Sequence, residues 1–158
     1  MKKFEFTGET KTISLFFRTA TLHRIRAVAE FGLVKVGDLG GWIEKEENLS
    51  HEGKAWVCGD AKVWGNAKVC GDAEVFSARH VLVIGAMGSR DDFTTFFRDK
   101  DNEITVKCGC FLGKIDKFLE KVTQTHGDSK YALVYRAAVE VARLQIDLSG
   151  EAPKDADE

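Results

Sequence analysis

The residues best suited to chemistry lie in one glycine-rich stretch, GAMGSRDDFTTFF, which spans residues 85–97. Gly85 and Gly88 allow the backbone to turn its N–H groups inward, a geometry that binds anions. The stretch also offers hydroxyl groups, a planar guanidinium suited to phosphate or carboxylate, and rings that can stack on a base. We therefore predict a site for a nucleotide-like ligand, formed by Ser89, Arg90, Asp92, Thr94, Thr95 and Phe97.

The same stretch has a second interpretation that needs no ligand. It is compatible with a glycine hairpin in which Arg90 pairs with Asp91 or Asp92 and the phenylalanines belong to the core. Phe96 and Phe97 are adjacent, so in a strand they point to opposite faces, and one of them needs cover from beyond its own module. A ligand, a partner chain or a neighbouring helix can supply that cover.

No catalytic set emerges from the residue pattern. The sequence has no serine in a nucleophile elbow and no glycine-rich phosphate loop that ends in Lys-Ser or Lys-Thr. The carboxylate pairs Asp91–Asp92 and Asp99–Asp101 are expected on turns, where such pairs are solvated. We therefore predict a non-enzymatic protein with no catalytic residue and no cofactor.

The cysteines do not predict a metal site. Cys108 and Cys110 form a C-x-C pair in a predicted strand, while Cys58 and Cys70 occupy equivalent positions of a repeat. A zinc site needs about four ligands, and no paired histidine or second C-x-C lies in step with the first. We expect free thiols and no metal.

A six-residue repeat dominates the middle of the chain. Each unit places an alanine, then a valine two positions later, then a glycine followed by Asp or Asn. Ala and Val two apart face the same side of a strand, and the glycine pair forms a corner. This period is typical of a parallel β-helix with about three units in each coil, so the roughly five units here make fewer than two coils.

The remaining segments predict strands before the repeat and an α+β unit after it. Strands are expected at 11–17 and 23–29, then a hairpin with strands at 93–98 and 103–110. Apolar stripes predict helices at 114–125 and about 130–146, the second so apolar that most of its sides must be covered. The fold class is mainly β: a short left-handed parallel β-helix, then a β-hairpin and two helices. The predicted organisation is an N-terminal β cap at 1–47, the β-helix at 48–84, the α+β module at 85–148 and a disordered tail at 149–158.

The overall composition narrows the choice of partner. The 158 residues are 44% hydrophobic and 30% charged, with a net charge of −2, as in an ordinary soluble domain. A chain with this charge balance is not expected to bind nucleic acid mainly through electrostatic attraction. No apolar run reaches the roughly 18 residues of a membrane span, and the N-terminus lacks a signal-peptide core. We expect a cytoplasmic protein with no membrane or nucleic-acid partner.

The segment LHRIRAVAEFGLVKVGDLGGWIEKEENLSHEGKAWV, residues 22–57, resembles the N-terminal signature of bacterial and prophage hexapeptide-repeat proteins. That signature joins an arginine-bearing strand, a G-x-x-GGW turn, an acidic stretch and LS-x-x-G-x-x-W-V. The matching positions are Arg24 or Arg26, Gly37, Gly40, Gly41, Trp42, Leu49, Ser50, Gly53, Trp56 and Val57.

The resemblance covers roughly residues 12–84 and implies a left-handed parallel β-helix that is usually trimeric. This chain departs from the family in having far fewer repeats. The stretch from Ile84 to Tyr131 also resembles a module appended to such phage and prophage proteins, which implies a context but no activity. Because two short coils expose strand edges, we expect the β-helix to act as a trimerising stem, giving a homotrimer or a multiple of it.

Three functions follow from these features. The first is an oligomeric phage-type binding protein, in the host cytoplasm if phage-encoded, that sequesters a nucleotide-derived signal of a host defence system. The second is a protein–protein inhibitor or adaptor that binds a host defence protein through an exposed aromatic surface including Trp56 and Trp64. The third is a degenerate acyltransferase with His51 or His80 as its base, as the resemblance implies for longer relatives.

Overall fold

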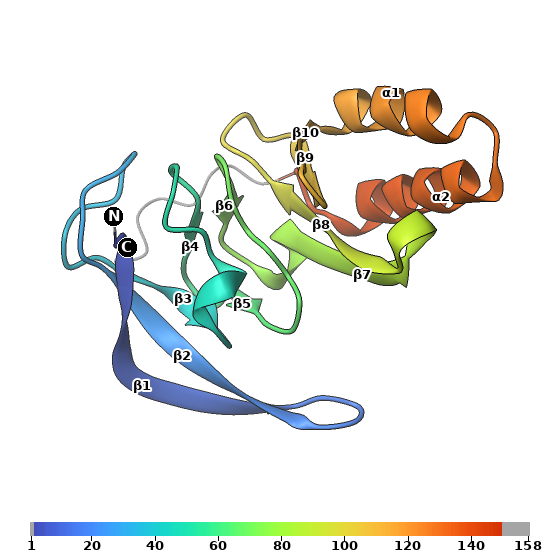
Figure 1. Ribbon diagram of the computed structural model, residues 1–158. Coiled ribbons are helices and arrows are strands. Elements are labelled where there is room, and N and C mark those ends of the chain that lie inside the picture. Colours follow the sequence, from blue (N-terminus) through green and yellow to red (C-terminus); the bar gives the residue numbers. More distant parts are fainter. Residues whose placement is uncertain (1, 150–158) are drawn as a thin grey trace.

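The computed structural model describes residues 2–149, and its elements form three β-sheets and two C-terminal helices (Figure 1). The tail predicted at 149–158 lies, apart from its first residue, outside the described residues. Figure 1 shows the N-terminal strands at one end, the repeat in the middle and the helices at the other end. The three short 3-10 helices are η1 (Glu46–Asn48), η2 (Ala78–His80) and η3 (Gly88–Arg90).

The first sheet is mixed. Its order is β1-β2-β3-β5, antiparallel between its first three strands and parallel between β3 and β5. The strands expected in the N-terminal β cap are therefore present, and β1 begins seven residues earlier than its expected start at Lys11. The bounds are β1 Phe4–Ser14, β2 Thr19–Ala27, β3 Leu39–Ile43 and β5 Lys62–Val63.

The expected parallel β-helix is wrong. The repeat contributes β5 to the mixed sheet, while β4 (Trp56–Val57) and β6 (Glu74–Val75) form a separate two-stranded parallel sheet. The strands β4 and β5 are each two residues long, and a glycine with a φ of 61° or 64° turns the chain soon after each of them. The later strand β5 pairs with β3, whereas β4 pairs with β6, because strands this short carry few hydrogen bonds and their pairing depends on the longer segments around them.

The repeat does bury the side chains it was expected to bury. Its four alanines and four valines all lie in one core, each with at most 3% of its surface exposed. Trp56, in contrast, was expected to point outward but is buried edge-to-face against Phe31, with ring centroids 5.3 Å apart. Only Trp64 stays partly exposed. An aromatic surface built on both tryptophans is therefore not available.

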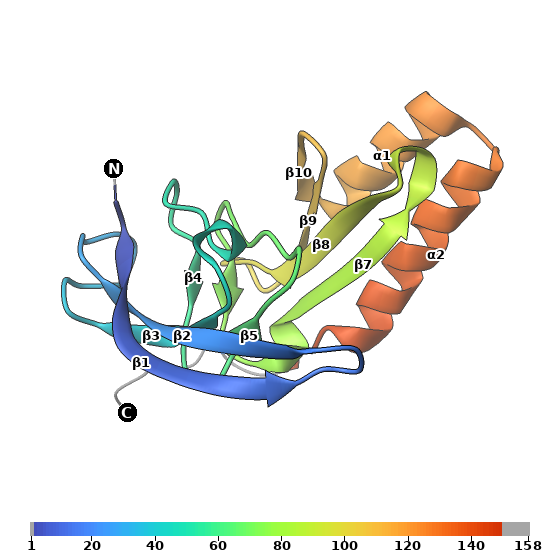
Figure 2. The same cartoon turned by 60° about the horizontal axis from the view of Figure 1, so that its bottom comes forward.

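The C-terminal sheet and helices confirm the predicted hairpin and helix pair. Four antiparallel strands follow the order β10-β9-β8-β7, and both helices cover one face of this sheet (Figure 2). The domain boundary predicted at 84/85 falls inside its first strand. The bounds are β7 Val81–Met87, β8 Asp92–Arg98, β9 Ile104–Cys108, β10 Phe111–Lys114, α1 Ile115–His126 and α2 Lys130–Gln145.

Strand β8 joins the two halves of the chain because its side chains alternate. Phe96 packs among the helices, in a core that also contains Phe118 and Tyr135. Phe97 points the other way, into the core formed by the repeat. The cover that the adjacent phenylalanines require is thus provided within the chain, by the helices on one face and the repeat on the other.

A buried carboxylate fixes the turn between β8 and β9. Asp99 accepts hydrogen bonds from the Thr105 hydroxyl at 2.7 Å and the Lys114 ammonium at 3.0 Å. The backbone amides of Asp101 and Glu103 also donate to it, at 2.9 and 3.1 Å. Burial disfavours the ionised form, but these hydrogen bonds outweigh it, so the pKa of Asp99 lies below its ordinary value. The ionised carboxylate therefore links this turn to Thr105 of β9 and Lys114 of β10.

Candidate functional site

Four of the six predicted ligand residues line one pocket at the end of the C-terminal sheet. Ser89 and Arg90 come from η3, and Asp92 and Thr94 come from β8. The pocket has a volume of about 270 Å³ and lies between these turns and helix α1. We refer to it as the η3–α1 pocket.

The other two predicted residues lie elsewhere, because successive side chains of a strand point to opposite faces. Thr95 is buried on the repeat side, where its hydroxyl accepts a hydrogen bond from the Lys68 amide at 3.0 Å. Phe97 is fully buried in the repeat core. Neither lines the η3–α1 pocket, so alternation along β8 separates the predicted set into two groups.

The two glycines of the loop allow close packing of neighbouring side chains. Gly88 has a φ of 76°, and a Cβ there would lie 2.1 Å from the Tyr135 hydroxyl oxygen. A Cβ on Gly85 would lie 2.5 Å from the Phe93 ring. Gly88 therefore lets η3 rest directly on α2, which fixes where Ser89 and Arg90 stand.

Helix α1 supplies the opposite wall of the η3–α1 pocket. Lys121 and Thr125 are four residues apart and so share a helix face, next to His126. The His126 ring stacks on Tyr135 at 5.6 Å, with 23° between the ring planes. Sequence reasoning did not place Lys121 or Tyr135 in the site. The i, i+4 spacing of Lys121 and Thr125 indicates that they share one face of α1. The sequence does not indicate which side of the sheet the helix covers.

The charges of the η3–α1 pocket favour an anion. Its permanent cations are Arg90 and Lys121, against the single carboxylate of Asp92. No ion pair within residues 2–149 includes Arg90, so the expected alternative of an Arg90 pair with Asp91 or Asp92 is not formed. The Arg90 guanidinium instead lies near the β9–β10 turn, 3.6 Å from the position of a Cβ on Gly109.

The pocket also contains aromatic and sulfur groups. Phe111, Phe118 and Tyr135 form part of its lining, and Phe111 is the least buried of the three. Cys108 and Cys110 line the same pocket as free thiols, and the Cys108 sulfur accepts a hydrogen bond from the Thr94 hydroxyl at 3.4 Å. In the described part of the chain, no three His, Cys, Asp or Glu side chains gather closely enough to hold a metal ion.

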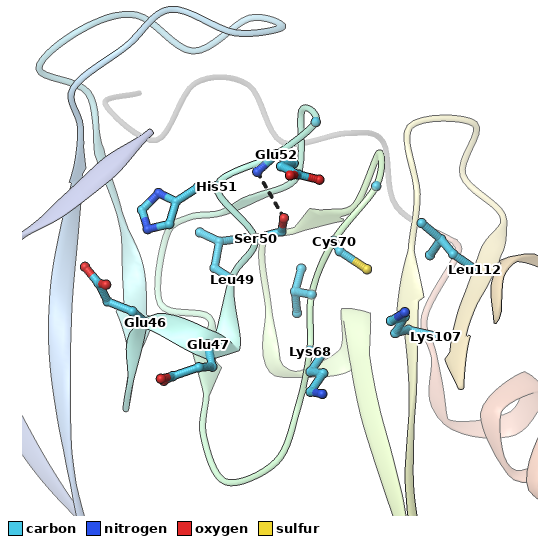
Figure 3. Close-up of a pocket in the computed structure, with 13 residues that line it drawn as sticks. Glu46, Glu47, Leu49, Ser50, His51, Glu52, Lys68, Cys70, Lys107 and Leu112 are labelled. Carbon is cyan, nitrogen blue, oxygen red and sulfur yellow. Dashed lines mark hydrogen bonds between the residues drawn. The ribbon is translucent and has the colours of Figure 1, made fainter. Parts of the chain in front are cut away.

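A larger groove of about 700 Å³ lies between the segment after η1 and strands β9 and β10 (Figure 3). Glu46 and Glu47 stand on one side of it and Lys68 and Lys107 on the other. Glu52 adds a further carboxylate to the groove. With three carboxylates against two lysines, this groove is less suited to an anion than the η3–α1 pocket.

The groove's histidine and cysteine are held in their neutral forms. His51 stacks on Phe4, and its Nδ1 accepts a hydrogen bond from the Lys3 amide at 3.0 Å. Burial lowers the pKa of His51 and raises the pKa of the Cys70 thiol. His80 is similar, because its Nδ1 accepts from the Phe76 amide at 3.1 Å and burial lowers its pKa. Both histidines considered as acyl-transfer bases thus use one ring nitrogen to bind backbone.

Comparison with known proteins gives no independent assignment. No protein-family model matches the chain, and no curated protein matches it either. No helix in residues 2–149 is long and apolar enough to cross a membrane. The proposed function is therefore based on the chemistry of the η3–α1 pocket.

Proposed function

We propose that the protein binds a small, anionic, nucleotide-like molecule in the η3–α1 pocket and sequesters it. The observation that carries this proposal is that Arg90 and Lys121, from separate segments, line the same pocket as three aromatic side chains. A guanidinium binds phosphate in a bidentate manner, and an ammonium adds a point charge. Phe111, the least buried of the three rings, offers a stacking surface for a base.

The pocket's hydroxyl groups support the same ligand class. Ser89, Thr125 and Tyr135 come from three different elements that line the pocket. Hydroxyls both donate and accept, so they suit the ribose and phosphate oxygens of a nucleotide. The volume of about 270 Å³ lies just below the usual range of roughly 300–1,000 Å³ for ligand sites. We infer that it holds one base with its sugar, or one sugar phosphate, rather than a whole dinucleotide.

The proposal is tested by thermal melting with a nucleoside monophosphate, ribose 5-phosphate and inorganic phosphate as probes that fit the pocket, and with ADP-ribose, cyclic dinucleotides and cyclic trinucleotides as larger probes that can enter it with one nucleotide unit. At a hundredfold excess over Kd, a ligand stabilises the folded state by about 2.7 kcal/mol. We expect the melting temperature to rise by several degrees with at least one nucleotide. Because the binding is electrostatic, added salt should weaken it.

Matched lysine variants locate the site. Lys117 and Lys121 are both exposed on the same helix, but Lys117 is not part of the pocket lining and pairs with Glu120 at 3.5 Å. We expect Arg90→Ala and Lys121→Ala to weaken binding at least tenfold by isothermal titration calorimetry, and Lys117→Ala to leave it unchanged. A flat screen with all probes would contradict the proposed function. Binding that survives Arg90→Ala combined with Lys121→Ala would place the ligand outside the η3–α1 pocket.

A further inference from the structure

The tip of the β1–β2 hairpin presents two adjacent phenylalanines to solvent. Phe16 and Phe17 are each 92% exposed, and their rings meet edge to face at 4.6 Å. Figure 1 shows this hairpin projecting from the rest of the chain, with its tip apart from both helices. Contiguous exposed apolar surface of this kind marks an interaction site in a soluble protein.

The two phenylalanines occupy the bend of the hairpin. The Leu15 amide donates to the Arg18 carbonyl at 2.7 Å, which leaves Phe16 and Phe17 between the paired residues. Neither has a positive φ, so large side chains fit this turn without backbone strain. Small polar residues are nevertheless the usual choice for an exposed turn, and two large apolar side chains that gain no burial within the chain point to a role outside it.

The hairpin is rigid up to its tip. Leu15 packs on a small core that includes Leu22 and Trp42. Arg18 donates two hydrogen bonds to the Glu44 carboxylate, at 2.6 and 3.0 Å. The backbone on both sides of the phenylalanine pair is therefore anchored before any partner binds, which reduces the conformational entropy lost when the pair is covered.

Helix α2 carries a second uncovered apolar surface. Leu133, Ala137, Val141 and Leu144 are spaced along one line of the helix and are all exposed, with Leu133 at 60% and Leu144 at 87%. The spacing of four, four and three residues places them on one face. The sequence predicted that this helix would be covered on most sides, yet its own chain leaves this face bare.

We propose that these two surfaces meet between copies of the chain: the Phe16–Phe17 tip of one copy docks on the Leu133–Leu144 face of α2 in a second copy. The area supports a second copy as the occupant. Two phenylalanines offer roughly 300–500 Å². Reciprocal exchange uses two tips and covers an equal area on two helices, so it buries about 1,200–2,000 Å² in total. This is the amount that stable protein–protein interfaces require, about 1,200–2,000 Å².

Multi-angle light scattering on the full chain tests this contact. We expect the wild type at about 100 µM, a concentration above the Kd of an interface of this size, to have about twice the chain mass of 17.6 kDa. Phe16→Ser with Phe17→Ser removes the tip, and Leu133→Ser with Leu144→Ser removes the receiving face. Each double variant should weaken association by roughly a hundredfold or more and appear as a monomer. Leu33→Ser is the matched control, because Leu33 is 87% exposed but lies on neither surface, and it should leave the mass unchanged.

A mixing experiment makes the test independent of any folding defect. The tip variant keeps an intact α2 face, and the α2 variant keeps an intact tip, so an equimolar mixture regains one of the two contacts. Because one contact buries only about half of the area, the mixture should form a mixed dimer at a higher concentration than the wild type, whereas neither variant alone should associate there. A mass of three chains that falls to one in the tip variant would support the same contact closed into a ring. A monomeric wild type, or an oligomer that persists in both double variants, would overturn the proposal.

Discussion

The chain buries two hydrophobic cores, and they are built from different kinds of side chain. Half of the buried residues in the core of the repeat are the alanines and valines that recur every six residues. The core beneath the helices takes its buried residues mainly from α1, α2, β8 and β9, and it includes the large side chains of Phe96, Phe118 and Tyr135. In the first core the same two residue types recur at regular intervals, whereas the second core combines side chains of different size and type from different elements.

This difference explains where the candidate site lies. In the repeat, the strands are only two residues long, and the alanine and valine side chains that face inward are apolar and small. In the C-terminal half, the ends of four strands meet two helices, so side chains from η3, β8, β10, α1 and α2 reach one pocket. Chemical variety is concentrated where elements of different type converge.

The strongest test of the two-core description uses adjacent residues of β8. Phe96→Ala and Phe97→Ala should each lower the free energy of unfolding by about 3–5 kcal/mol, the usual cost of removing a buried phenylalanine. Chemical denaturation measures this loss. Leu112→Ala, at a half-exposed position on β10, should cost far less.

Hydrogen exchange should then separate the two effects. In Phe97→Ala we expect faster exchange at amides of the repeat such as Trp56, and in Phe96→Ala at amides of α1 and α2. Equal loss of protection throughout the chain in both variants would show that the cores open as one unit, and the comparison between them would fail.

A buried lysine gives the repeat core a pH dependence of its own. Lys3 is only 3% exposed, and its ammonium donates to the Ala55 carbonyl at 2.7 Å and lies 4.8 Å from the Phe31 ring centre. Burial lowers the pKa of Lys3 from 10.5 to about 8. Between these values the unfolded chain binds the proton and the folded chain does not. The free energy of unfolding should therefore rise with pH across this window, by at most about 3 kcal/mol.

Comparison of two lysine variants isolates this contribution. Lys3→Met should remove the rise between pH 8 and 10.5, whereas Lys2→Met, at the exposed neighbouring position, should retain it. Urea titrations at a series of pH values provide the measurement. An equal slope in Lys3→Met and wild type would mean that Lys3 keeps its charge in the folded state.

Two glycines, one in the repeat and one beside the η3–α1 pocket, should differ in the stability that is lost when each is replaced by alanine. Gly65, in the repeat, has a φ of 64° and nothing within 4 Å of the position of a Cβ, whereas Gly88 combines a φ of 76° with close contact to Tyr135. Gly65→Ala should cost about 1–2 kcal/mol from backbone strain alone. Gly88→Ala should cost more, because η3 must also move away from α2, and it should weaken ligand binding as Arg90 shifts. Equal costs in thermal denaturation would contradict the close packing of η3 on α2.

The local elements were predictable because their signals are local. The apolar stripe with Phe118 and Val122 predicts α1, and the polar turn between Arg98 and Glu103 predicts the hairpin of β8 and β9. The repeat also predicts correctly which alanines and valines are buried, since that depends only on the alternation of side chains along a short strand.

The site was only half predictable for the same reason. Ser89, Arg90, Asp92 and Thr94 were found by composition, and the structure places them together. Thr95 and Phe97 were grouped with them although a strand sends neighbouring side chains to opposite faces. Lys121 and Tyr135 join the pocket through helix packing, which no nearby sequence signal specifies.

The sequence by itself determined the repeat, its inward-facing residues, the hairpin and the two helices, because periodicity and turn chemistry act over a few residues. Tertiary structure decided how the repeat strands pair, because β3 and β4 take their parallel partners, β5 and β6, from further along the chain and two extended residues carry too few hydrogen bonds to choose alone. It also decided which cations meet in the η3–α1 pocket and that Phe16 and Phe17 remain uncovered. These outcomes depend on distances between segments that are remote in the chain, and a one-dimensional pattern does not encode them.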